Sequence, residues 1–390
     1  MKCPHCLAEL TYRERRDKKC PQCQKAFALE PRENTLKMSD LRLRGLADRL
    51  SHQGTYRYTS AQLAHFAIRR ELEPALKTGF SWSEPSAFVA VSISGVVFLV
   101  AFACLLFGIP GTRSLSSAVI ALVIGAVIGL IAAGIYYGAV QSSNLYRRLL
   151  PVLESFAMTY ITPWASVHGT LPGRATDQEI AALRQAQLPP SRVRAVLASP
   201  VADVLDCLRA NGLPERLELA LLSTDGPHSA ADESVIALLR QKPRLPLLLI
   251  HDASVAGCLL PALVPGRWGL APNHRVIDLG LRPRHVKQQR LPWKREQTPK
   301  ELLDLLERRA QMPGGLTLEK DELEWLRQGF VTSALFIPPA RLVNVVTRAV
   351  ERLASAPSAA ERRAPARVVD PEAQAQVQAR AIGFMTWPQR

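Results

Sequence analysis

Two long apolar runs dominate the hydrophobic pattern in the first half of the chain. Residues 85–112 and 114–146 contain no Asp, Glu, Lys or Arg, and only Arg113 separates them. Each run is longer than the roughly 20 residues that a helix needs to cross a bilayer. Helices of globular cores are rarely apolar on every side over such a length. The pattern therefore predicts a transmembrane hairpin in residues 86–140, with helices at about 86–109 and 115–140.

Basic residues flank this predicted hairpin on both sides. Because Lys and Arg accumulate on the cytoplasmic side of membrane proteins, they predict a multi-pass protein of a bacterial inner (plasma) membrane with both termini in the cytoplasm. The lipid bilayer is then its first expected partner. The flanking residues are Arg69, Arg70 and Lys77 before the hairpin and Arg147 and Arg148 after it.

Small residues recur at every fourth position of the second apolar run, among them Gly125 and Gly129. Such a face allows two helices to approach closely. It predicts packing against the first helix of the same hairpin or, alternatively, a homo-oligomer formed through the Gly125 and Gly129 face. Neither run carries a charged residue or histidine, which argues against an ion or proton pathway.

Short β-prone runs alternate with helical patterns in the second half of the chain. Such alternation is typical of parallel strands joined by crossover helices, and the continuous apolar run 247–250 indicates a sheet covered on both faces. We therefore expect an α/β Rossmann-like domain with a parallel sheet and further helices at its C-terminal end. The expected strands are 192–199, 217–223, 245–252 and 275–281, and the expected C-terminal helices are 298–310, 319–329 and 340–354.

Four of the seven cysteines form two pairs near the N-terminus, Cys3 with Cys6 in CPHC and Cys20 with Cys23 in CPQC. Two thiolates on one tight turn can bind one side of a metal ion, and a second such turn completes a tetrahedral site. Over about residues 1–25 only, the pairs resemble the zinc-ribbon class with its rubredoxin-like knuckles. The resemblance implies one structural Zn²⁺ on these four thiolates, with iron as the open alternative.

The charge of the chain bears on its partners. The formal net charge is +15, and the excess of basic over acidic residues is 6 in residues 1–85 and 8 in residues 141–390. A charge spread in this way fits an anionic membrane surface as well as nucleic acid. In the ribbon, Glu14 and Asp17 interrupt the basic spacer and Tyr12 is its only aromatic residue, whereas single-strand binding needs more stacking residues.

Taken together, these patterns predict a multi-domain membrane protein. Its parts are a zinc ribbon (1–30), a short helical segment (31–85), the transmembrane hairpin (86–140), a helical segment beside the membrane (141–190), the Rossmann-like domain with its C-terminal helices (191–354) and a flexible tail (355–390). The tail is rich in Ala, Pro and charge, so it has little apolar surface to bury.

A candidate catalytic site follows from the end of the apolar strand near residue 250. His251 and Asp252 come where open α/β sheets place their ligands, and Asp225 and Asp278 lie at or near the ends of neighbouring strands. If all four converged, they would form a metal or general-base site. The alternative is structural: Asp252 caps the following helix and His251 packs at the sheet edge. The chain has no GxGxxG after a strand, no GxxxxGK[ST], no GxSxG and no HExxH motif.

Two anchored modules without a complete catalytic motif predict a scaffold or adaptor, held at the membrane with its domains facing the cytoplasm, that recruits protein partners. An enzyme, hydrolytic or nucleotide-related, with its site near His251 and Asp252 is the first alternative. Nucleic-acid binding through the ribbon at a membrane is the second.

Overall fold

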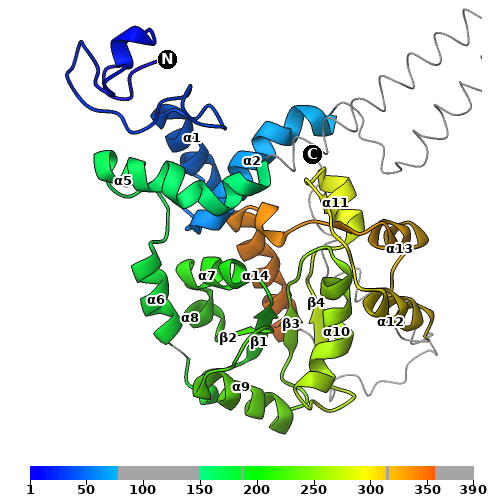
Figure 1. Ribbon diagram of the computed structural model, residues 1–390. Helices are drawn as coiled ribbons and strands as arrows, with labels where there is room; N and C mark the ends of the chain where they lie inside the picture. Colours follow the sequence, from blue (N-terminus) through cyan, green and yellow to red (C-terminus); the bar gives the residue numbers. More distant parts are fainter. Residues whose placement is uncertain (78–148, 187, 313–315, 356–390) are drawn as a thin grey trace, which may run out of the picture. The chain divides into compact units, whose positions relative to one another are not determined.

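The computed structural model describes residues 1–77, 149–186, 188–312 and 316–355 (Figure 1). Two parts of the chain that lie far apart in sequence, Met1–Arg69 and the stretch from Pro151 onward, belong to one compact unit. In this unit, a ribbon and several helices precede an α/β domain.

Two of the helices before the sheet, α1 and α2, begin at polar caps. Ser39 caps α1, since its hydroxyl accepts a hydrogen bond from the Arg42 backbone N–H. Thr59 and Gln62 exchange reciprocal hydrogen bonds at the start of α2. The elements of this part are η1 (Arg13–Arg15), α1 (Asp40–Leu50), α2 (Ser60–Lys77), η2 (Ala157–Ile161), α5 (Thr162–His168), α6 (Asp177–Gln185) and η3 (Pro190–Arg192).

A four-stranded parallel sheet with the order β2-β1-β3-β4 forms the centre of the α/β domain. The parallel sheet agrees with the sequence prediction, because each apolar run is followed by a helix that returns the chain to the other end of the sheet. Its strands are β1 (Ala195–Ser199), β2 (Leu219–Ser223), β3 (Leu247–Leu249) and β4 (Val276–Asp278).

Helices cover both faces of this sheet (Figure 1). Alternate strand residues point to opposite faces, and those on one face form a buried core with apolar side chains of α9 (Ala230–Gln241) and α10 (Val255–Arg267). On the other face, α7 (Ala202–Ala210) contacts β1 and β2, and α8 (Leu213–Leu217) and α14 (Pro339–Ser355) contact α7.

The chain after the sheet returns to the carboxyl end of β3. Ala253 and Thr332 form an antiparallel bridge with N···O distances of 3.0 Å in both directions. The following η4 (Ala334–Phe336) contacts α7, the helix after β1. The buried segment from Thr332 to the end of η4 therefore occupies the place beside β1 and β3 where open α/β sheets often bind ligands. The remaining elements are α11 (Pro283–Gln289), β5 (Lys294–Arg295), α12 (Lys300–Gln311), α13 (Lys320–Arg327) and β6 (Phe330–Val331).

Within the described residues, none of the helices is long and apolar enough to span a membrane. The most apolar of them, α10, has 13 residues and contains Pro261 and Pro265, whereas a span needs about 20 residues. The longer α2 carries Arg69, Arg70 and Glu71. This finding corrects the prediction of a membrane protein, and with it that of a multi-pass inner-membrane location.

Several sequence predictions fall on parts of the chain outside the described residues. These are the predicted spans 86–109 and 115–140, the Gly125 and Gly129 face, and the predicted tail 355–390 except for Ser355.

Candidate metal centre

The four N-terminal cysteines lie together. All four Sγ atoms are within 4.8 Å of one another, and the Sγ···Sγ distance is 3.7 Å both for Cys3–Cys23 and for Cys6–Cys20. A disulfide would require about 2.05 Å, so these are separate thiols. Around a tetrahedral metal with metal–sulfur bonds of about 2.3 Å, neighbouring sulfurs are about 3.8 Å apart. The cluster therefore has the dimensions of a four-thiolate metal site.

Two matching turns place the cysteines, as in the knuckles that the sequence predicted. In the first turn, Leu7 N–H donates to Cys3 O (3.1 Å) and Cys3 N–H donates to Ala8 O (2.9 Å). The second turn, seventeen residues later, makes the same two bonds. Gln24 N–H donates to Cys20 O (2.8 Å), and Cys20 N–H donates to Lys25 O (3.0 Å).

Both turns also need the same unusual backbone conformation. Leu7 and Gln24 have φ values of +61° and +57°, a left-handed region that costs energy for residues other than glycine. Two such residues at equivalent positions indicate that the ribbon depends on a strong interaction to hold its turns, and a bound metal would supply one.

The apolar core of the ribbon is small. Cys3, Leu10, Cys20 and Phe27 are its buried members, and a core of this size cannot by itself offset the entropy of ordering the segment. A buried ion pair adds to it: Arg15 donates to both carboxylate oxygens of Glu30, at 2.7 and 3.1 Å.

The ribbon is attached to the helices that follow through Asp40. The buried carboxylate of Asp40 accepts the backbone N–H groups of Ala28 and Leu29, both at 2.8 Å, and lies 2.5 Å from Nε2 of His168 on α5. The ring of His168 packs 5.4 Å from that of His5, between the first two cysteines. His5 therefore contacts a neighbouring helix.

The pKa values of Cys20 and Cys6 are shifted in opposite directions. Hydrogen bonds from the backbone N–H groups, first that of Cys23 and then that of Gln22, lower the pKa of Cys20 to about 7. At Cys6, a hydrogen bond from the Ala8 backbone N–H favours the thiolate, but desolvation and the neighbouring thiols outweigh it and raise the pKa to about 11. Four thiolates at this spacing need a cation between them, so the residues fit a metal ion.

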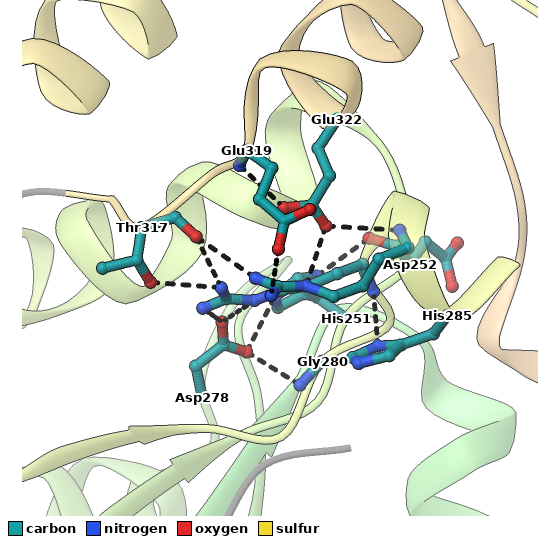
Figure 2. A network of polar contacts seen from close by, with 10 residues as sticks. His251, Asp252, Asp278, Gly280, His285, Thr317, Glu319 and Glu322 are labelled. Atoms are coloured by element: carbon teal, nitrogen blue, oxygen red, sulfur yellow. Dashed lines mark hydrogen bonds and ion pairs between the residues drawn. The ribbon is translucent and has the colours of Figure 1, made fainter. Parts of the chain in front are cut away.

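A second group of predicted site residues lies in a buried network at the ends of β3 and β4 (Figure 2). His251 is fully buried; its Nε2 lies 3.0 Å from Asp278 Oδ1, and its Nδ1 lies 2.8 Å from the backbone oxygen of Asp252. Arg282 donates to the other carboxylate oxygen of Asp278 at 2.7 and 3.2 Å. The backbone N–H of Gly280 completes the set at 2.8 Å.

The charged groups of this network favour one another's ionised forms. Burial disfavours the imidazolium of His251, but the attraction of Asp278 outweighs it and raises the pKa of His251. Burial likewise disfavours the carboxylate of Asp278, yet His251 and then Arg282 hold its pKa well below the usual range. The pair is an ion pair inside the protein, and both polar ends of the histidine ring are occupied.

The four predicted catalytic residues do not converge. Only His251 and Asp278 meet. The Asp252 side chain points away from them (Figure 2) and accepts the backbone N–H of Ala334 at 2.6 Å. Asp225 is exposed after β2 and lies 3.9 Å from Arg267. Since β1 and β3 lie between β2 and β4, about 14 Å separates the strands that carry Asp225 and Asp278.

The structural alternative for this group assigned the cap of the following helix to the wrong residue. Ser254, and not Asp252, caps α10, through a 3.0 Å hydrogen bond from Gly257 N–H. Because Asp252 is buried, its pKa is raised even though the Ala334 N–H bond opposes the shift.

No family model, curated protein or solved structure matches the chain. Its function must therefore be argued from its own residues.

Sequence reasoning missed the residues that extend the histidine network. Arg284 donates to Glu322 at 3.0 Å and to Glu319 at 3.1 Å, and Arg282 donates to the backbone oxygen of Thr317 at 2.9 Å (Figure 2). These bonds attach α13 to the end of the sheet. The signal in the sequence was the pair of arginines just after the strand of Asp278, but their partners lie more than thirty residues away.

Proposed function

We propose that the ribbon binds one structural Zn²⁺ through Cys3, Cys6, Cys20 and Cys23. The Sγ···Sγ distances of 3.7 Å on two matching turns support this most directly. Closed sites of four cysteines are typical of structural zinc, because no coordination position remains for a substrate. Zinc would then stabilise a segment whose apolar core is too small to fold it.

Metal analysis of the purified full chain tests this proposal. We expect one zinc per chain, and less than a tenth of that for Cys20→Ser, because the change removes one of the four ligands of a closed site. Cys258→Ser is the matched control, since Cys258 is buried in α10 away from the cluster, and it should keep the full zinc content. Iron at full occupancy in place of zinc, or equal metal content in both variants, would contradict the proposal.

We further propose that the chain is an adaptor that recruits protein partners through the zinc-folded ribbon. The supporting observation is the exposure of two anchor-type side chains on it: Leu7 is 62% exposed and Tyr12 is 40% exposed. Protein interfaces are built around such side chains with charged residues at the rim. Arg32 lies over the Tyr12 ring at 4.6 Å and holds it in place.

Crosslinking and co-purification with the full chain test the adaptor proposal. A protein captured by the wild type should be lost with Leu7→Asp or Tyr12→Asp and lost again when a chelator removes the zinc. Met312→Asp is the matched control, because Met312, at the end of α12, is 51% exposed, between Tyr12 and Leu7. A partner retained by both ribbon variants would contradict recruitment through the ribbon.

Catalysis at His251 and Asp252 finds no comparable support. The His251 ring is bonded at both nitrogens, and Oδ1 of Asp252 accepts the backbone N–H of Ala334. His251→Ala is therefore expected to lower the stability of the fold, and any loss of activity is expected to follow from that.

A further inference from the structure

The amino-terminal edge of the sheet carries a group of basic side chains that the proposed function does not use. In a parallel sheet, all strands begin at the same edge. Arg194 directly precedes β1, Arg275 directly precedes β4, and Lys242 and Arg244 lie on the turn before β3. All four are exposed.

Backbone hydrogen bonds bring these residues together. Arg275 N–H donates to Pro243 O at 3.4 Å, which places the turn before β3 beside the start of β4. Val196 N–H donates to Pro246 O at 2.9 Å, which places the start of β1 beside the same turn. With strands about 4.8 Å apart, the basic residues span roughly 10 Å from β1 to β4.

Acidic residues neutralise only part of this edge. Glu218, which directly precedes β2, forms ion pairs with Arg192 and Arg194. Lys242, Arg244 and Arg275 have no ion-pair partner among the described residues. The surrounding segments 240–246 and 265–276 contain five Lys or Arg residues and no Asp or Glu.

Helix dipoles account for two of the basic residues in these segments. Arg240 and Arg267 lie in the last turns of α9 and α10, where a positive charge complements the helix carbonyl end. Lys242, Arg244 and Arg275 lie outside the helices, so the dipole does not explain them.

The kind of partner follows from what accompanies these charges. A protein interface needs an apolar or aromatic centre, and the exposed large hydrophobic side chains of the described residues, which are Leu7, Tyr12, Met158, Val167 and Met312, all lie elsewhere. Trp268, the aromatic residue nearest in sequence, is buried. Binding to a nucleic-acid backbone is instead mainly electrostatic and needs no apolar centre.

We propose that this basic edge, formed by Arg192, Arg194, Lys242, Arg244 and Arg275, binds the phosphate backbone of a double-stranded nucleic acid without reading its base sequence. A duplex is the better fit because single-strand binding relies on exposed aromatic side chains. The edge presents its cations on loops and at the end of the three-residue η3, and no α-helix or β-ribbon places them to enter a groove. The proposal is independent of the ribbon and its metal.

Fluorescence anisotropy with the full chain and a labelled duplex DNA of random sequence tests this proposal. If three unpaired cations contact three phosphates, the affinity falls about 40-fold between 50 and 200 mM salt from this edge alone. Neutralising Lys242, Arg244 and Arg275 together to Gln should lower the affinity at 50 mM salt at least tenfold. It should also reduce the slope of log K against log salt by about 3.

A variant with the same change in net charge provides the control. Lys300, Arg308 and Lys320 are exposed on α12 and α13, and their joint change to Gln should leave affinity and slope within twofold of the wild type. Circular dichroism should show that both variants are folded, because all six side chains are exposed.

Three outcomes would overturn the proposal. The first is that the wild type does not bind the duplex at 50 mM salt. The second is that the edge variant and the control variant lose affinity equally. The third is a preference for another polyanion: poly-glutamate or a single strand of equal charge binds the edge more tightly than the duplex. Poly-glutamate would then indicate an acidic protein partner.

Discussion

At the scale of single residues, the pair of His251 and Asp278 is the most consequential feature of the α/β domain. Asp278 is bonded to two cations at once, His251 and Arg282, and all three are largely buried. Removing one member of such a group leaves the others charged without compensation. The pair is therefore expected to stabilise the fold.

Replacing Asp278 by Ala should lower the free energy of unfolding by about 3–5 kcal/mol, because two buried cations lose their shared partner. Chemical denaturation measures this change. Asp225→Ala is the control. The side chain of Asp225 is 65% exposed, so this variant should change the free energy of unfolding by no more than about 0.5 kcal/mol. Equal effects of the two variants would contradict a structural role for the pair.

The same pair predicts a pH dependence. Asp278 raises the pKa of His251 in the folded state, so the folded protein binds this proton more tightly than the unfolded chain does. The stabilisation is complete below the unfolded pKa of about 6.5 and is lost as the pH rises through the folded pKa. The difference in unfolding free energy between wild type and His251→Ala should therefore be largest near pH 6 and should shrink toward pH 9.

The Asp278→Asn background provides the control for this titration. Without the carboxylate, the attraction and the side-chain hydrogen bond that most raise the pKa of His251 are lost while burial still lowers it, so adding His251→Ala should change the stability by an amount that no longer falls above pH 6. A fall of the same size in both backgrounds would show that Asp278 does not cause it.

At this scale, the candidate site proposed from the sequence joined four residues, of which His251 and Asp278 meet and Asp252 and Asp225 lie apart. Successive residues of an extended chain point in opposite directions, so His251 and Asp252 could not both face one site. Asp225 follows an edge strand two positions from β3. Asp225 lies apart from His251 and Asp278 because of the strand order, which apolar runs in the sequence do not reveal.

At the scale of elements, short-range patterns predicted more than long-range ones. The apolar runs located all four strands of the parallel sheet, and the two CPxC motifs located the knuckles. The segment from Phe330 to Phe336 was not predicted, because its hydrogen bonds with Asp252 and Ala253 join residues about eighty positions apart. Its apolar composition indicates burial but does not show which residues it contacts.

The ribbon is the element most sensitive to the metal. Its core of four side chains is too small to keep it folded, so removing the metal should unfold the ribbon while the sheet persists. Hydrogen exchange should then rise at least tenfold in residues 1–30 after chelation and stay within twofold in β1 and β3. Unchanged protection of Phe27 and Leu10 in the chelated protein would contradict a structural role for the metal.

At the scale of the whole molecule, the compact unit is assembled from two parts of the chain. Tyr58 pairs with the segment around Arg174, with N···O distances of 3.1 and 2.9 Å. Gly173 makes this approach possible: its φ is +74°, and an added Cβ would lie 2.5 Å from Ser51. Sequence patterns did not predict this assembly, because it joins residues more than a hundred positions apart.

Asn211 is one of the side chains that hold the two parts together. Its amide accepts the Arg57 backbone N–H at 2.9 Å and donates to the Arg57 carbonyl at 2.8 Å. Asn211→Ala would leave both backbone groups without these partners, at a cost of about 1–3 kcal/mol for each that stays buried. Hydrogen exchange in α1 and α2 should therefore rise more than exchange in β1 and β3.

Asn273→Ala is the matched control for this change, since Asn273 lies on an exposed loop before β4. Asn273→Ala should leave hydrogen exchange unchanged in α1 and α2 and in β1 and β3. If Asn211→Ala instead raises exchange equally in the helices and the strands, the two parts unfold together. If it raises exchange in neither, the contacts with Arg57 do not hold the parts together.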